Sequence, residues 1–128
     1  MVVDSSAFIA VAMREAGWER IEHLLLSAEG PIMPATCAVE CHLVLSGKGV
    51  AAPSKQFDDL VADFGIRVTT FGEVEFRVAR DAFERYGKGR HPARLNFGDC
   101  MAYAVAKVEG LPLLYTGDDF AKTDIPSA

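Results

Sequence analysis

The sequence predicts an α/β protein whose central, mostly parallel sheet is covered by helices. Short apolar segments that resemble strands alternate with amphipathic segments along all 128 residues. Because a helix between two strands carries the chain back across the sheet, this alternation favours parallel neighbouring strands. The chain shows no internal repeat, low-complexity tract or linker. Its length suits one domain over residues 1–128.

The first part of the chain predicts short strands separated by longer helices. Ser5 and Ser6 can cap a helix after the opening strand "MVVD", and Gly17 breaks that helix. "PIMP" is typical of a short strand, and the helical segment after it stops near Gly47. The expected elements are a strand at 1–4, helices at 7–16 and 18–28, a strand at 31–34 and a helix at 35–46.

The second part continues the same alternation. Phe57, Leu60, Val61 and Phe64 follow the i, i+3, i+4, i+7 spacing that predicts an amphipathic helix. The β-branched segment "IRVTTF" predicts a strand. The expected elements are a helix around 57–64, a strand at 66–71, helices at 74–86 and 99–109, and a strand at 111–116, followed by a turn-rich tail.

Several acidic residues stand where the expected parallel strands and helices meet. Asp4 ends the first strand, Asp118 and Asp119 follow the last strand, and Asp99 opens a helix. In parallel α/β sheets, reactive sites lie outside the carboxyl ends of the strands, so these acids are expected at one edge. Helix capping and turn formation are the structural alternatives for each of them.

Glu40 is a further candidate because its predicted helix face is apolar. It shares that face with Cys37, Cys41 and Val44, and no Lys or Arg lies within one helical turn. A buried, ionised carboxylate without a cation or donors costs several kcal/mol. Converging carboxylates are hard oxygen ligands that suit Mg²⁺ or Mn²⁺. Such an ion can activate water and neutralise charge on a phosphoryl group.

Positive charge gathers in the segment "YGKGRHPARLN", although the formal net charge of the protein is -5. That net charge argues against broad, nonspecific nucleic-acid binding. A local patch remains compatible with it, and Lys88, Arg90 and Arg94 could hold phosphates that flank a scissile group near Asp99. A solvated surface loop is the structural alternative.

The cysteines, the lengths of the apolar segments and the N-terminal residues argue against a zinc protein, a membrane protein and a secreted protein. Cys37, Cys41 and Cys100 are expected to be buried, and their spacing matches no common zinc site. No apolar segment is long enough to span a bilayer, and the N-terminus "MVVDSSAF" does not have the pattern of a signal peptide. The sequence therefore predicts a cytoplasmic protein without membrane association.

Four segments in register resemble PIN-domain ribonucleases, specifically the VapC-type toxins of bacterial toxin–antitoxin pairs. The segments are "VVDSSAF", "CAVECHLVL", "LNFGDC" and "LLYTGDDFAKTDI". The resemblance implies a three-layer sandwich and a metal-dependent endoribonuclease with Mg²⁺ or Mn²⁺. Its catalytic and metal-binding acids would be Asp4, Glu40, Asp99 and Asp119, with Asp118 as the alternative for the fourth acid.

The same resemblance implies supporting residues and partners. Ser6 and Thr116 match small hydroxyl residues that brace the first acid in the family. The family likeness further implies a homodimer that cuts RNA, leaving 5′-phosphate and 3′-hydroxyl ends. It also implies inhibition by a cognate antitoxin, whose C-terminal segment lies in an apolar groove and can push a basic side chain into the acidic pocket.

Two other functions are compatible with the residues. One is a phosphohydrolase or phospho-acceptor domain in which Asp4 attacks phosphorus, although the phosphatase version favours D-x-D and Ser6 stands at the third position. The other is a noncatalytic module that binds RNA or protein. An acid on an apolar helix face disfavours this second reading, because an idle buried acid costs free energy.

Overall fold

The computed structural model describes residues 1–128 and contains one sheet of four parallel strands. The strands occur in the order β3-β2-β1-β4, and every pairing between neighbours is parallel. Val2 of the central strand β1 is in register with Ile32 on one side and with Leu113 on the other. The predicted parallel sheet is therefore confirmed. The strands are β1 (Val2–Val3), β2 (Ile32–Pro34), β3 (Arg67–Thr69) and β4 (Leu113–Leu114).

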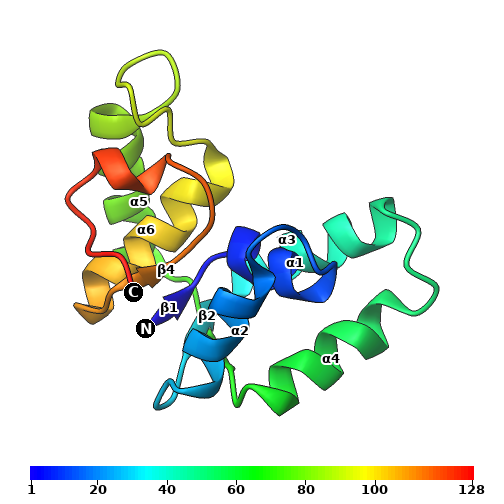
Figure 1. Ribbon diagram of the computed structural model, residues 1–128. Coiled ribbons are helices and arrows are strands. Elements are labelled where there is room, and N and C mark those ends of the chain that lie inside the picture. Colours follow the sequence, from blue (N-terminus) through cyan, green and yellow to red (C-terminus); the bar gives the residue numbers. More distant parts are fainter.

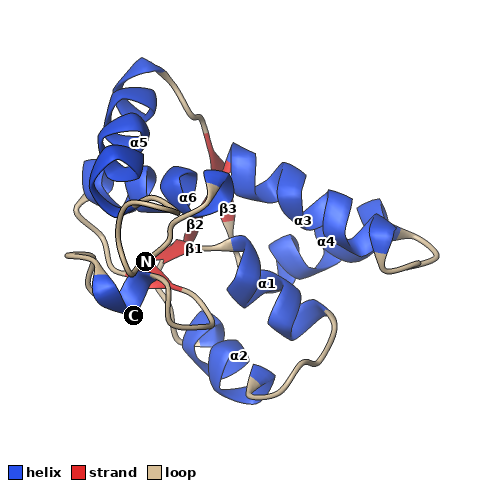
Figure 2. Cartoon of the chain, turned by 90° about the horizontal axis from the view of Figure 1, so that it is seen from above, coloured by secondary structure: helices blue, strands red, loops and turns tan.

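Six α-helices cover this short sheet from both sides. In Figure 1, α5 and α6 lie to one side of the strands while α1, α2 and α4 lie to the other, and the N- and C-termini are neighbours. Figure 2 shows the same division from above, so the three-layer arrangement is confirmed. The helices are α1 (Ser5–Ala12), α2 (Trp18–Leu26), α3 (Ala35–Gly47), α4 (Pro53–Asp63), α5 (Glu73–Tyr86), α6 (Phe97–Glu109) and the 3₁₀ turn η1 (Phe120–Lys122).

Helices α1 and α6 each begin two residues earlier than the sequence predicts, because polar residues in front of them are their caps. The expected cap of α1 at Ser5 and Ser6 is wrong: the side chain of Asp4 is the N-cap and accepts a hydrogen bond from the Ser6 amide. Asn96 caps α6 and accepts from the amide of Asp99. Both acids therefore stand at helix N-termini, where partial positive charge favours a carboxylate.

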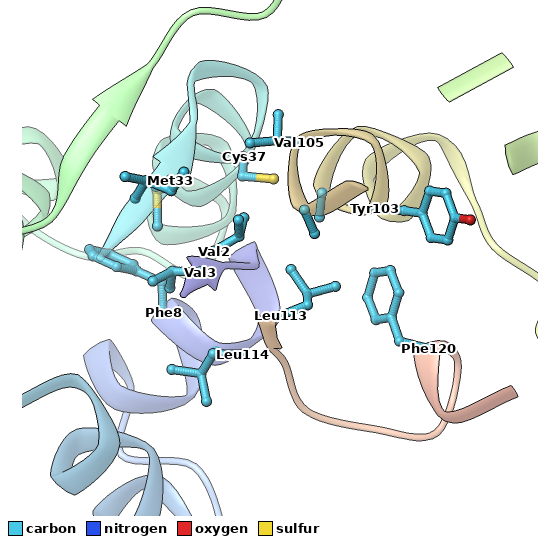
Figure 3. Packing of buried hydrophobic residues seen from close by; sticks show 14 of the residues in the cluster. Val2, Val3, Phe8, Met33, Cys37, Tyr103, Val105, Leu113, Leu114 and Phe120 are labelled. Atoms are coloured by element: carbon cyan, nitrogen blue, oxygen red, sulfur yellow. The ribbon is translucent and has the colours of Figure 1, made fainter. Parts of the chain in front are cut away.

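A single cluster of 30 buried residues forms the core. Figure 3 shows Val2 and Val3 of β1 packed among Phe8, Met33 and Leu113. The strands are short and entirely apolar at their centre because helices cover both faces. The three cysteines are buried without disulfides, as predicted. Burial raises the pKa of the Cys100 thiol to about 11, which keeps this thiol protonated and inert near neutral pH.

The sheet determines where the candidate site lies. The amide of Asp4 donates to the carbonyl of Leu114 at 2.9 Å, so the chain leaves β1 and β4 side by side. Both strands therefore deliver their following residues to the same edge. None of the helices has the length and apolar character needed to cross a membrane.

Two adjacent leucines on α2 test the packing of the core. Leu25 is 1% exposed and Leu26 is 65% exposed. We expect Leu25→Ala to lower the free energy of unfolding by about 3 kcal/mol, because it removes buried methyl groups and leaves a cavity. Leu26→Ala should change it by less than about 0.5 kcal/mol. Urea unfolding followed by circular dichroism measures both, and equal losses would contradict this packing.

Candidate active site

A cavity of about 300 Å³ opens at the carboxyl edge of the sheet. Four acidic residues from four separate elements line it: Asp4 after β1, Glu40 on α3, Asp99 on α6 and Asp119 before η1. The structure thus brings together the four acids that the sequence predicts. The other lining residues are Ser5, Ser6, Ile9, Val44, Asn96, Thr116 and Phe120.

Asp4 is the most deeply placed of the four acids and is only 3% exposed. Its Oδ2 accepts hydrogen bonds from the amide of Ser6 at 3.0 Å and from the hydroxyl of Ser6 at 2.5 Å. Its Oδ1 is buried and has no hydrogen-bond partner. Burial raises the pKa of Asp4, the negative charge of Glu40 adds to this effect, and the two donors of Ser6 oppose it.

Ser6 connects the first strand to the last one. Its Oγ donates to Asp4 and accepts a hydrogen bond from the amide of Thr116 at 3.0 Å. The sequence predicts Thr116 as a hydroxyl brace, but the residue reaches this network through its main-chain N–H. Ser6 therefore fixes both the direction of the Asp4 carboxylate and the position of the chain that leaves β4.

Glu40 lies half-buried on α3 at the border of the cavity. The hydroxyl of Ser5 donates to its Oε2 at 2.8 Å. Gly98 on α6 permits this placement, because a Cβ atom at that position would lie 2.7 Å from Oε2. The neighbouring Cys37 and Cys41 are fully buried, so the apolar surroundings predicted for Glu40 are present on the core side.

Asp99 combines a capping role with exposure to the cavity. Its Oδ2 accepts from the amide of Asn96 at 2.7 Å, which completes a reciprocal capping box. Burial raises the pKa of Asp99 to about 6, and the charges of Asp4, Asp119 and Glu40 add to this effect. Burial is the largest cause of this shift, the hydrogen bond from Asn96 opposes it, and the neighbouring carboxylates add a smaller contribution.

The structure distinguishes the two neighbouring aspartates after β4. Both aspartates are exposed, but Asp119 lines the cavity and Asp118 does not. The turn begins at Gly117, whose φ of +87° is open mainly to glycine, and it ends at the buried Phe120. Geometry therefore favours Asp119 as the fourth acid.

The donor set of the cavity suits a hard divalent cation. Its charged groups are all carboxylates, and Asp4 Oδ1 is a buried oxygen that lacks a partner. No three acidic, histidine or cysteine side chains form a closed ligand cluster. Like charges that are not neutralised keep apart, and Mg²⁺ retains several waters and needs only one or two carboxylates. The residues present therefore fit such an ion.

The predicted basic residues line a second cavity, which shares no residue with the acidic one. Lys88, Arg90, Arg94 and His91 line a hollow of about 460 Å³ in the loop between α5 and α6, which projects at the top of Figure 1. None of the three predicted RNA-binding cations has an acidic partner within 4.0 Å. The structure thus keeps these cations separate from the carboxylates of the acidic cavity.

Two polar residues of the site were missing from the sequence-based set. Asn96 lines the acidic cavity and caps α6, and Ser5 holds Glu40. An asparagine in front of a predicted helix is a capping signal that could have identified Asn96. The contact of Ser5 joins residues 35 positions apart, so no local pattern indicates it.

Comparisons with known proteins agree with this architecture. The PIN domain model matches residues 1–126. Ribonuclease VapC42 of Mycobacterium tuberculosis is 40% identical over 129 residues, which cover 100% of this chain and 98% of the relative. Ribonuclease VapC36 of the same organism is 39% identical over 126 residues, covering 98% of this chain and 91% of the relative.

Solved structures show the same fold at low sequence identity. The crystal structure of M. tuberculosis VapC20, described as a sarcin–ricin loop cleaving toxin, matches with a TM-score of 0.81 at 15% identity and covers 99% of this chain and 97% of that one. A toxin–antitoxin complex from Klebsiella pneumoniae matches with a TM-score of 0.70 at 13% identity, covering 96% and 92%. The chain belongs to the PIN-domain family and, within it, to the VapC ribonucleases.

Proposed function

We propose that this chain is the endoribonuclease toxin of a toxin–antitoxin pair and that it hydrolyses RNA phosphodiester bonds with the help of a divalent cation. The observation that carries the proposal is the convergence of Asp4, Glu40, Asp99 and Asp119 on one cavity. The relatives named VapC ribonucleases support the activity.

Asp4, Asp99, Glu40 and Asp119 would hold Mg²⁺ or Mn²⁺ in this cavity. When bound, the ion supplies a lowered pKa for a coordinated water and neutralises charge that builds on the phosphoryl group. Ser6 orients the Asp4 carboxylate, and Ser5 orients that of Glu40. These contacts keep the acids in place before the RNA arrives, so less reorganisation is needed during the reaction.

The basic loop would position the RNA backbone. Lys88, Arg90 and Arg94 are unpaired cations in a protein with a formal net charge of -5. The amide of Lys88 donates to the carbonyl of Leu95 at 3.0 Å, which closes the loop at its base. Phosphates held there would place the neighbouring scissile group over the acids, leaving 5′-phosphate and 3′-hydroxyl ends.

The proposed partners are supported by the similar proteins of known structure. A cognate antitoxin is supported by the toxin–antitoxin complex among the structural neighbours. We further propose that the toxin is a homodimer and that it acts in the cytoplasm, where its RNA substrate is found.

Replacing individual acids by their amides tests the assignment of the site. Asp4→Asn, Glu40→Gln, Asp99→Asn and Asp119→Asn should each lower kcat/KM for RNA cleavage by about 100-fold or more, because even outer partners of metal ligands contribute 10- to 100-fold. Asp118→Asn is the matched control and should retain activity within about threefold. Cleavage of purified RNA in Mg²⁺, with EDTA as the blank, measures this. Full activity of Asp4→Asn would refute the proposal.

Gly98→Ala tests the placement of Glu40 without removing a charge. The new Cβ would lie 2.7 Å from Glu40 Oε2 and force that side chain to move. We expect kcat to fall by about 10- to 100-fold while the melting temperature changes little, because the displaced atom ends a flexible side chain. Gly47→Ala is the control, since a Cβ there meets nothing within 4 Å. Unchanged cleavage by Gly98→Ala would show that RNA cleavage does not depend on the position of the Glu40 side chain.

The pH dependence of stability tests whether folding raises the pKa of Asp99, which burial causes first and the neighbouring acids increase. The raised pKa of Asp4 acts in the same sense. The pKa of Asp99 rises from 3.8 to about 6 on folding, so the native state binds more protons in this range. In EDTA, the free energy of unfolding should therefore decrease as the pH rises from about 4 to about 6. The lowered pKa of Asp124 acts in the opposite sense, mainly at pH values near and below its unfolded value of 3.8, so the upper part of the window reports on the raised pKa values.

Urea unfolding at a series of pH values measures this slope. Asp99→Asn should flatten it, and Mn²⁺ should flatten it in the wild type by favouring the ionised carboxylates. A slope that is the same in wild type and Asp99→Asn would show that folding does not raise the pKa of Asp99.

A further inference from the structure

Asn96 brings a hydrogen-bond donor to the acidic cavity, and the proposed mechanism does not yet use it. Asn96 lines this cavity together with Asp99, which stands three residues later in the first turn of α6. Its Oδ1 accepts from the amide of Asp99 at 3.0 Å, and its own main-chain N–H donates to the Asp99 carboxylate at 2.7 Å. The capping box therefore uses the oxygen of the Asn96 side chain and leaves the nitrogen, Nδ2, without a partner in the protein.

The other polar side chains of the cavity accept hydrogen bonds or have already donated theirs. The four carboxylates only accept when they are ionised. The hydroxyls of Ser5 and Ser6 donate to two of these carboxylates. Thr116 carries the remaining hydroxyl, which can donate to an acid as well as accept. The amide nitrogen of Asn96 is thus the one side-chain group of the cavity that can only donate.

A phosphodiester in this cavity needs such a donor. Its nonbridging oxygens carry negative charge in the transition state, and carboxylates repel that charge. A donor that is held in place before the reaction stabilises the charge without reorganisation. Asp4 Oδ1, which is buried in the same cavity and has no partner, independently indicates that the cavity takes a ligand.

The position of Asn96 along the chain suits a contact with the phosphate. The basic loop ends at Arg94, and the next residue, Leu95, is fully buried and donates its amide to the carbonyl of Tyr86 at 3.0 Å. Asn96 follows at once with an extended backbone and begins α6. It therefore stands on the chain between the cations that would hold the flanking phosphates and the acids.

We propose that the Nδ2 amide of Asn96 donates a hydrogen bond to a nonbridging oxygen of the scissile phosphate and is a catalytic residue. The inference rests on the proposed ribonuclease function and adds to it a group that touches the reacting phosphate. In the hydrolysis, the water oxygen bonds to phosphorus and the bond from phosphorus to the 3′ oxygen breaks. Water gives up one proton and the 3′ oxygen takes one, while Asn96 keeps its protons and stabilises the charge on the phosphate oxygen.

Replacing Asn96 by glycine removes the donor and keeps the helix. Glycine is nearly as good an N-cap as asparagine, so the melting temperature should change little. We expect kcat for RNA cleavage to fall by about 100-fold or more, with a smaller change in KM. Asn96→Asp retains the capping oxygen but replaces the nitrogen by an acceptor, so it should lose at least as much. An unchanged kcat in Asn96→Gly would overturn the proposal.

Sulfur substitution at the scissile phosphate distinguishes a direct contact from a capping role. The substrate is an RNA with one phosphorothioate at the mapped cut, separated into its two diastereomers. Because sulfur is a weaker acceptor than oxygen, one diastereomer should slow the wild type by about 10-fold more than it slows Asn96→Gly. If Asn96 acted only through Asp99, each diastereomer would slow both proteins equally, and Asn96→Gly would need more Mg²⁺ for half-maximal cleavage. That result would refute the direct contact.

Nuclear magnetic resonance tests the contact without cleavage. Asn96 is the only asparagine and Gln56 the only glutamine, so their side-chain amide signals are easily assigned. The probe is a dinucleotide with one phosphodiester, added in Ca²⁺ in place of Mg²⁺. The Asn96 amide should shift, while that of Gln56, which donates to the carbonyl of Ala12 at 2.8 Å, should stay unchanged.

The same spectra separate the failure of this inference from the failure of the proposed function. Shifts of the main-chain amides of Asp4 and Asp99 without a shift of the Asn96 side chain would show that the phosphodiester binds without this contact. No shift in any of these signals would count against phosphodiester binding in the cavity, and with it against the proposed ribonuclease function.

Discussion

A buried carboxylate at the end of the central strand constrains the rest of this structure. Asp4 is 3% exposed, and one of its oxygens has no partner within the protein. An ionised group in that position costs several kcal/mol unless a cation compensates it. The helices that meet there bring further carboxylates rather than cations, which raises the cost. A divalent ion bound to these acids, as proposed, would relieve this unfavourable electrostatic feature.

The positive charges are kept apart from this acidic centre. Lys88, Arg90 and Arg94 lie in the loop between α5 and α6, and none of them pairs with an acid. If the two sets were in contact, they would neutralise each other and leave no field for a substrate. A polyanion can satisfy both at once, with its backbone on the loop and its reacting phosphate over the ion-binding acids. Under the proposed function, this separation would give the small acidic protein a local surface for RNA.

Much of this arrangement could be predicted from the sequence. The alternation of apolar runs and helical stripes predicted the parallel sheet, because the hydrophobic pattern is set by which faces are covered. Asp4 and Asp99 were identifiable because they stand where strands end or helices begin. The cap of α1 was misassigned because aspartate and serine cap helices almost equally well, so the sequence cannot rank Asp4 against Ser5. The choice between Asp118 and Asp119 needed the geometry of the turn after β4.

Which apolar residues of α5 are buried could not be predicted, and the pattern on this helix explains why. On α5, the small residues Ala79 and Ala82 are buried, while Phe76 and Phe83 stay exposed. A hydrophobic stripe in sequence cannot reveal which of its members face a neighbouring helix.

The most direct test of the account is anomalous diffraction from crystals soaked in Mn²⁺. The account predicts a manganese peak within ligating distance of Asp4 Oδ1 and the Asp99 carboxylate. Manganese bound only elsewhere, with Asp4 Oδ1 still unpartnered, would contradict it.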